Sequence, residues 1–120
     1  MGAKSFEDLI VWQKADMLST QVDQLIKTFP AKELYRLSDQ MRGAASSIPA
    51  NIAEGFGRWS PRDQAHFYEI AKASGNELKV HVMRAMDLGY CDDVLEAAFL
   101  LDEVCAMLYV LRKKVLARGS

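Results

Sequence analysis

The chain has 120 residues, of which 50% are apolar and 26% carry a charge, and its formal net charge is −1 at pH 7. These values suit one soluble globular domain and exclude a strongly basic protein, whose overall charge would by itself indicate nucleic-acid binding. No apolar run reaches the roughly 18 residues that a membrane span needs, and two cysteines, Cys91 and Cys105, are too few for a disulfide framework. We therefore expect a cytoplasmic protein with no membrane segment, in which Cys105 is a small core residue.

The first predicted helix spans about residues 6–28. Ser5 and Asp8 have the spacing of a capping box, and Pro30 ends the segment. Between them, apolar side chains recur every three or four residues, which is typical of one buried helix face. These residues are Val11, Ala15, Leu18, Val22, Leu25 and Phe29.

The second predicted helix spans about residues 31–57 and contains the least generic stretch of the chain. Its apolar stripe is Leu34, Leu37, Met41, Ala44, Ile48 and Ile52. Pro49 removes a backbone donor, so the helix is either continuous and kinked or broken into two short helices. Because the apolar phase passes through the proline unchanged, we favour a kink at Pro49. Gly55 and Gly57 are expected to end the helix.

The third predicted helix spans about residues 61–88, with Ser60 as its N-cap and Pro61 at the first helical position. Its stripe is Phe67, Ala71, Ser74, Leu78, His81 or Val82, Ala85 and Leu88. Gly75 lies mid-helix at a cost of up to about 1 kcal/mol against alanine. Such a glycine indicates close packing of another element, and Gly89 ends the helix.

The fourth predicted helix spans about residues 93–117 and opens at Asp92 and Asp93. Residues 97–111 are apolar nearly all round, whereas a helix of a lone bundle needs only one apolar face. The excess predicts a second buried face and therefore subunit contacts. Because the connections are short and no strand pattern occurs, we predict an all-α, antiparallel up-down four-helix bundle that forms a single domain over residues 1–120.

Residues 47–58 read Ser-Ile-Pro-Ala-Asn-Ile-Ala-Glu-Gly-Phe-Gly-Arg, and this block is the most specific motif in the chain. Through it, the chain resembles the bacterial four-helix bundle proteins encoded within intervening sequences of the large-subunit ribosomal RNA gene, also labelled ribosomal protein S23-like. Further matching segments are Phe6-Glu7-Asp8-Leu9, Trp12-Gln13-Lys14-Ala15, Phe29-Pro30, Leu37 with Gln40, Glu77-Leu78 and Leu88-Gly89-Tyr90.

The resemblance implies an antiparallel four-helix bundle that assembles into a ring-shaped homopentamer and has no enzymatic activity. It also implies a relation to the accessory proteins of diversity-generating retroelements, which share the fold and bind nucleic acid and a reverse transcriptase. The chain departs from the family pattern at Arg42-Gly43, where the family tends to have two consecutive arginines. It departs again at Ala73-Ser74-Gly75, where the family tends to have Gly-Ser and then an apolar residue.

Dispersed basic residues are the candidates for a nucleic-acid interface, because phosphate binding needs several cations on one face. The candidates are Arg42, Arg58, Arg62, Arg112, Lys113 and Lys114. Trp59 lies in the turn before the third helix and is the better of the two tryptophans for stacking on a base. The alternative is a solvated face for the cations, with the tail favourably placed at a helix C-terminus, and a packing role for Trp59.

The small-residue block gives a second set of candidates, namely Ser47, Pro49, Asn51, Glu54 and Gly55. These polar residues either form a site or satisfy backbone groups freed by the proline, and we favour the structural role because buried polar groups must be hydrogen-bonded. No metal-ligand spacing or catalytic motif occurs, so we expect no metal, no cofactor and no enzyme. Our functional hypothesis is an oligomeric scaffold on structured RNA or on a reverse-transcriptase–RNA complex; the alternative is an interaction or structural oligomer without nucleic acid.

Overall fold

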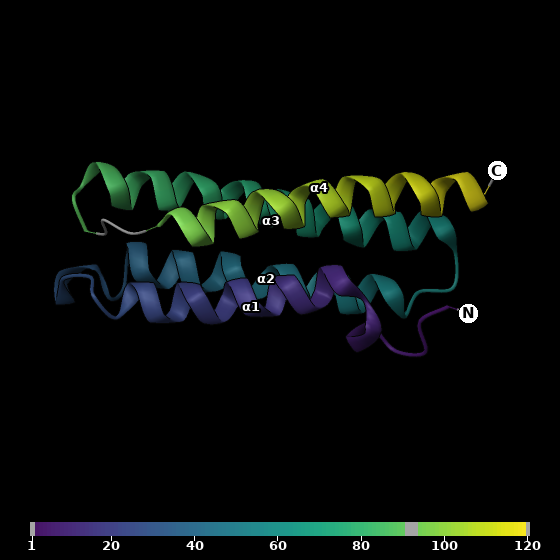
Figure 1. The fold of residues 1–120 in the computed structure, drawn as a ribbon, viewed down its shortest axis with the longest axis horizontal. Helices are drawn as coiled ribbons and strands as arrows, with labels where there is room; N and C mark the ends of the chain where they lie inside the picture. The colour runs from purple at the N-terminus through teal and green to yellow at the C-terminus, as the bar shows by residue number, and fades with distance from the viewer. Residues whose placement is uncertain (1, 91–93, 120) are drawn as a thin grey trace.

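Four α-helices make up the molecule in a computed structural model that describes residues 2–90 and 94–119. Figure 1 shows consecutive helices running in opposite directions, so that both chain termini lie at one end of an elongated bundle. The helices are α1 (Ile10–Ile26), α2 (Leu37–Phe56), α3 (Pro61–Asp87) and α4 (Leu95–Arg118). The all-α four-helix prediction is confirmed. Among the described residues, no helix combines the length and apolar character that crossing a membrane requires.

The first helical segment is divided, because a short 3₁₀ turn, η1 (Phe6–Asp8), precedes α1. The predicted capping box is present, with the Asp8 carboxylate accepting from the Ser5 N–H at 3.2 Å. Leu9 then has extended backbone and packs its side chain against the core, so the α-helix begins at Ile10 rather than at residue 6.

A second 3₁₀ turn, η2 (Ala31–Glu33), occupies the start of the segment predicted as the second helix. The backbone of Arg36 is not helical (φ −124°, ψ −103°), and α2 therefore begins only at Leu37. Leu34 does not belong to the buried stripe, since its side chain is exposed. From Leu37 onward α2 is unbroken through Pro49, as expected, while a kink there stays a prediction.

Helix α3 begins and ends close to the positions that its capping residue, proline and glycine predict. Ser60 accepts from the backbone N–H of Asp63 at 3.0 Å, and Gly89 takes the left-handed conformation (φ 74°) that ends the helix. The buried face includes Tyr68 rather than Phe67, and Leu88 is exposed. Helix α4 begins at Leu95. Asp92 and Asp93, which were expected to open it, lie outside the described residues, as does Cys91.

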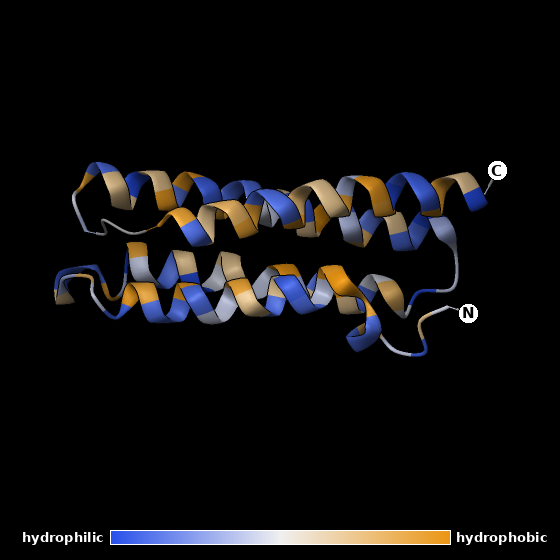
Figure 2. Cartoon of the chain, in the orientation of Figure 1, coloured by the Kyte–Doolittle hydropathy of each residue, from blue (hydrophilic) through white to orange (hydrophobic). Residues whose placement is uncertain are grey.

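The core runs the length of the bundle, and Figure 2 shows apolar and polar residues alternating along each helix. Gly75 confirms the predicted close packing, because an added Cβ would lie 2.7 Å from the Cys105 Sγ on α4. Cys105 itself is half-buried at this contact. Helix α4 also leaves apolar side chains exposed outside the core, Phe99 with 71% of its surface. The predicted second apolar face is therefore present, and its burial by another subunit stays a prediction.

Candidate nucleic-acid interface

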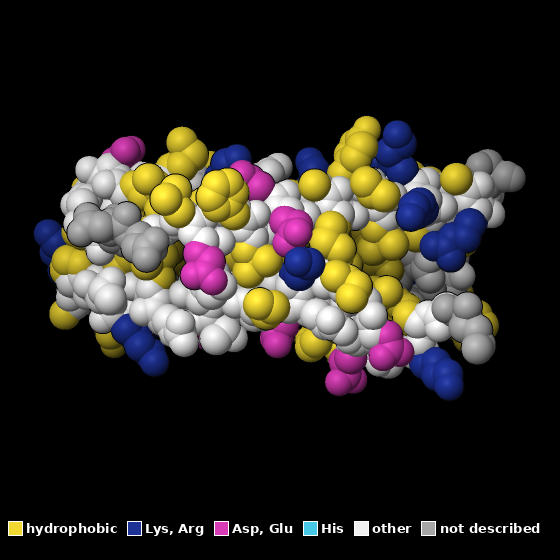
Figure 3. Space-filling view, viewed as in Figure 1, with side chains coloured by type: hydrophobic (Ala, Val, Ile, Leu, Met, Phe, Trp, Pro, Cys, Tyr) yellow, Lys and Arg dark blue, Asp and Glu magenta, His cyan; other side chains and the backbone are white. Residues whose placement is uncertain are grey.

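The α2–α3 turn and the C-terminal half of α4 lie at the end of the bundle that holds both termini (Figure 1). A Cβ added to Gly119 would lie 3.0 Å from the Cβ of Pro61, so the end of α4 abuts the start of α3. Figure 3 shows Lys and Arg side chains gathered over this part of α4. The fold thus brings most of the predicted interface residues to one end: Arg58, Trp59, Arg62, Arg112, Lys113 and Lys114.

Arg58 is already engaged within the chain. Its guanidinium lies 2.6 Å from the Glu54 carboxylate, one helical turn away, and 4.6 Å above the Phe67 ring. An ion pair with an exposed carboxylate neutralises part of the charge that Arg58 offers to a phosphate. The predicted motif residue Glu54 therefore acts here as the partner of a predicted interface residue.

Arg62 and Arg112 line a common surface depression with His66, Glu69 and Leu116. The Arg112 Nε lies 3.7 Å from the Glu69 carboxylate, is buried, and makes no hydrogen bond within the described chain. Arg62 has no carboxylate within ion-pair distance among the described residues and is exposed. The depression therefore holds two guanidinium groups against one carboxylate.

Trp59 is fully exposed, with 100% of its surface accessible. It follows Arg58 directly and stands two residues before the start of α3. The alternative that it packs within its own chain is therefore excluded by its exposure. A large ring held out in solvent beside cations has the chemical character of a stacking platform for bases.

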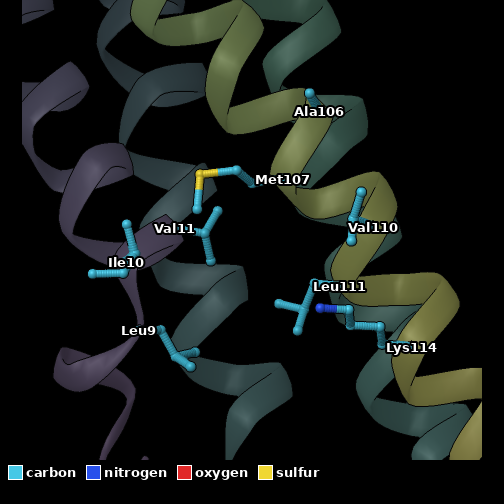
Figure 4. A pocket seen from close by; sticks show the side chains of 8 residues that line it. All are labelled: Leu9, Ile10, Val11, Ala106, Met107, Val110, Leu111 and Lys114. Atoms are coloured by element: carbon cyan, nitrogen blue, oxygen red, sulfur yellow. The ribbon is translucent and has the colours of Figure 1, made fainter.

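Lys113 and Lys114 point in different directions from α4. The Lys113 ammonium lies 5.3 Å from the centroid of the Tyr109 ring. Lys114 lines an open apolar groove between the start of α1 and α4, shown in Figure 4. Besides Lys114, this α1–α4 groove is lined by Leu9, Ile10, Val11, Ala106, Met107, Val110 and Leu111.

Arg42 does not join the cluster. It lies near the start of α2, about 20 Å along the helix from the end that carries Arg58. Its guanidinium is 3.5 Å from the Asp39 carboxylate. Within one protomer the predicted cations therefore do not form one continuous surface, because most of the length of α2 lies between Arg42 and the other cations.

Ser47 and Asn51 hold α2 together beside Pro49 and tie it to α3. The Asn51 amide donates to the Ser47 carbonyl at 2.8 Å and to the Ser47 hydroxyl at 2.9 Å. The Ser47 and Ser74 hydroxyls share a hydrogen bond of 2.8 Å across the two helices. These bonds lie within the chain, and the amide reaches the Ser47 carbonyl rather than the one at Ala45 that the proline frees. The structural role that we favoured for this block stays a prediction.

Gly55 has a different structural role from the one its sequence position suggested. It lies inside α2 and is buried, and an added Cβ would lie 2.9 Å from the Tyr68 ring. The helix ends at Phe56, with Gly57 in an ordinary right-handed conformation (φ −80°). Gly55 therefore permits close packing of α2 on α3, and it does not terminate the helix.

Sequence reasoning missed a polar pair at the opposite end of the bundle. Glu33 is buried, with 6% of its surface exposed, and its carboxylate accepts a hydrogen bond of 3.1 Å from the Tyr90 hydroxyl. Partial burial of the phenol raises the pKa of Tyr90, and so does the hydrogen bond to Glu33, while Arg36 and Arg84 lower it. The two residues are 57 positions apart, so no local pattern could have paired them.

Side chains suited to metals or covalent chemistry do not converge in the described parts of the chain. Among residues 2–90 and 94–119, no group of three or more His, Cys, Asp or Glu side chains is placed to hold an ion. His81 faces Glu77 at 3.4 Å as an isolated pair. Burial raises the pKa of the Cys105 thiol, which keeps it protonated and weakly nucleophilic at neutral pH.

Comparison with known proteins identifies one family. The family model described as 23S rRNA-intervening sequence protein matches residues 7–110. A search among curated proteins finds no match. The matched range includes the block at residues 47–58 and all of α1, α2 and α3.

Proposed function

The chain belongs to the 23S rRNA-intervening sequence protein family, and from this premise we propose that it is a non-enzymatic oligomeric scaffold that associates with structured RNA or with an RNA–protein complex in the cytoplasm. The observation that carries the RNA part is the fully exposed Trp59 at the same end of the bundle as the depression lined by Arg62 and Arg112. Cations neutralise phosphates without regard to sequence, and an exposed ring stacks on any base.

Self-association is supported by two different apolar surfaces on one chain. The first is the α1–α4 groove (Figure 4). The second is an outer strip where α3 meets α4. The Lys79–Asp102 ion pair, 3.2 Å long, spans this seam. One and two helical turns beyond it come the exposed side chains of Met83, Met86, Leu95 and Phe99.

Two unlike surfaces suit a ring better than a two-fold dimer. In a two-fold dimer the same patch meets itself, whereas in a ring one patch of each subunit meets a different patch of the next. We propose that the α3–α4 strip of one subunit packs into the α1–α4 groove of its neighbour, and that the ring is a pentamer. A ring would repeat the Trp59–Arg62–Arg112 end in every subunit and multiply its charge.

The test combines assembly mass and RNA titration on the same preparation. Light scattering is expected to give a mass about five times the 13.5 kDa of one chain. Binding to labelled structured RNA is expected to weaken steeply between low and moderate salt. Arg62→Glu should reduce both the affinity and the salt slope. Lys27→Glu, an equal charge change at the opposite end of the bundle, should leave them nearly unchanged.

The alternative function is an interaction or structural oligomer without nucleic acid, and the charge balance of the chain favours it. Net charge is −1, and Arg58 and Arg112 each have a carboxylate partner within the chain. If the intact oligomer binds no RNA even at low salt, the protein is an interaction or structural oligomer, and a protein such as a reverse transcriptase is sought by pull-down. If Arg62→Glu and Lys27→Glu weaken RNA binding equally, the proposed interface is contradicted.

A further inference from the structure

A polar cavity of about 370 Å³ lies at the end of the bundle opposite Trp59, Arg62 and Arg112. It is open to solvent on one side and is lined by residues of η2, the start of α2 and the end of α3, which lie at the same end of the bundle (Figure 1). Its polar lining residues are Lys32, Glu33, Arg36, Gln40, His81, Arg84 and Tyr90. Most small-molecule pockets are lined mainly by apolar groups, so a lining of this kind indicates a charged ligand.

Three cations face this cavity without an anionic partner. Within residues 2–90 and 94–119, no carboxylate lies at ion-pair distance from Lys32, Arg36 or Arg84. Arg36 directly precedes α2 and Arg84 lies in the last turn of α3, yet both lie near enough to the Tyr90 hydroxyl to lower its pKa. Both arginines, although exposed, therefore contribute positive charge to the same cavity.

Among the described residues, Glu33 supplies the one carboxylate that lines the cavity, and this carboxylate already has a partner. Glu33 accepts from the Tyr90 hydroxyl, and the Tyr90 ring packs on Phe29 with 5.5 Å between ring centroids. The backbone N–H of Tyr90 donates to the Ala85 carbonyl at 3.0 Å, which anchors the ring to the end of α3. Glu33 thus forms part of the wall. With one carboxylate against three cations, the described lining of the cavity has a surplus of two positive charges.

We propose that this cavity binds a phosphate monoester group, held by Arg36 and Arg84 with Lys32 as the third cation. A monoester carries close to two negative charges at neutral pH, which matches the surplus, whereas a diester carries one. Guanidinium groups from two directions suit the oxygens of a tetrahedral anion. A recessed cavity also admits a chain end more readily than the middle of a strand.

The monoester has two sources, a free nucleotide or the 5′ end of an RNA. This proposal does not depend on RNA association at the Trp59 end, because the two sites lie at opposite ends of the bundle. The first measurement is a titration of the full chain with adenosine 5′-monophosphate, followed by amide chemical shifts, with adenosine as the matched ligand lacking the phosphate. We expect shifts in η2 and at the end of α3 with the nucleotide only.

Arg36→Gln and Arg84→Gln should each weaken nucleotide binding about tenfold or more, because each removes a charged hydrogen bond. Arg118→Gln, an exposed arginine in the last turn of α4 at the other end of the bundle, serves as the matched control and should have no effect. The circular dichroism spectrum and melting temperature of each variant separate lost binding from lost folding. If the nucleotide causes no shifts at the cavity, or if Arg118→Gln weakens binding as much as Arg84→Gln, the proposal is overturned.

The source is distinguished with one RNA oligonucleotide prepared with a 5′-phosphate or a 5′-hydroxyl. A gain in affinity from the 5′-phosphate that Arg84→Gln abolishes supports the site with an RNA end as its ligand. Equal affinity of the two oligonucleotides, together with nucleotide binding that Arg84→Gln weakens, supports the site with a free nucleotide as its ligand. A 5′-phosphate gain that Arg84→Gln leaves intact contradicts the cavity as its source.

Discussion

The α2–α3 seam and the α1–α4 seam of the same bundle are built in opposite ways. Across the first, Gly55 lies directly against the Tyr68 ring, and the Ser47 and Ser74 hydroxyls bond at 2.8 Å. Across the second, large apolar side chains line an open groove, and a 2.8 Å ion pair from Lys14 to Glu103 bridges the helices. Small residues let helix backbones approach, whereas large residues packed at a wider separation leave room between them.

This difference indicates that the α2–α3 seam stabilises the single chain, whereas the α1–α4 seam has apolar surface available to a partner. The α2–α3 seam is complete, because its small residues are buried and its hydroxyls are paired. The α1–α4 seam leaves apolar surface exposed, including the half-exposed Ile10 and Val110. We therefore expect substitutions in the first seam to change the free energy of unfolding of the chain, and substitutions in the second to act mainly on assembly.

The largest effect on stability is expected from Gly55→Ala, which disturbs the close packing of α2 on α3. The added methyl group would lie 2.9 Å from the buried Tyr68 ring and 3.0 Å from the Phe67 Cβ. Overpacking of this kind costs about 1–3 kcal/mol, against a gain of up to about 1 kcal/mol in helix propensity. The net result should be a lower free energy of unfolding in urea denaturation.

Gly43→Ala is the matched control, because it makes the same change in the same helix. An added Cβ at Gly43 has no atom within 4 Å, so only the propensity gain remains. The control should therefore raise the free energy of unfolding by about 0.5–1 kcal/mol. Stabilisation by both substitutions would show that the α2–α3 seam has room for a methyl group, and the contrast between the two seams would fail.

The contacts between helices also show how far the sequence predicts the structure. Helix periodicity predicted four helices, and a mid-helix glycine correctly indicated the close contact of Gly75 with Cys105. Gly55 was assigned to a helix end because glycine near the end of a helical pattern is usually a stop signal. A packing role for such a glycine depends on Tyr68, which lies on another helix.

The candidate sites were less predictable than the fold. Spacing along α2 put Arg42 and Arg58 in one list, but the rise of the helix separates them by most of its length. The nearness of Arg62 to Arg112 depends on how α3 and α4 pack against each other. The Glu33–Tyr90 hydrogen bond joins residues 57 positions apart and depends on how α2 and α3 fold back between them. Such contacts arise from tertiary packing, and no local pattern in a single sequence encodes them.

A smaller effect is expected from Ser74→Ala, which removes one hydroxyl of the α2–α3 hydrogen bond. A hydrogen bond of this kind contributes about 1 kcal/mol. Ser46→Ala is the control, since the exposed Ser46 hydroxyl bonds only to the Gly43 carbonyl of its own helix and should stay within about 0.5 kcal/mol. A double-mutant cycle with Ser47→Ala measures the coupling, and a value near zero would show that the bond does not stabilise the seam.

The smallest effect is expected from the Lys14–Glu103 ion pair, which spans the open seam. Both side chains are partly exposed, at 32% and 49%, so solvent screens the attraction and the coupling energy should be about 0.2–1 kcal/mol. A double-mutant cycle with Lys14→Met and Glu103→Gln, repeated at high salt, measures the coupling and its decline. The Lys79–Asp102 pair, at 3.2 Å and with 56% and 60% exposure, should couple less. A salt-insensitive coupling well above 1 kcal/mol at Lys14–Glu103 would mean that the α1–α4 seam is desolvated in solution, as it would be if a neighbouring subunit covered the pair as well as the groove.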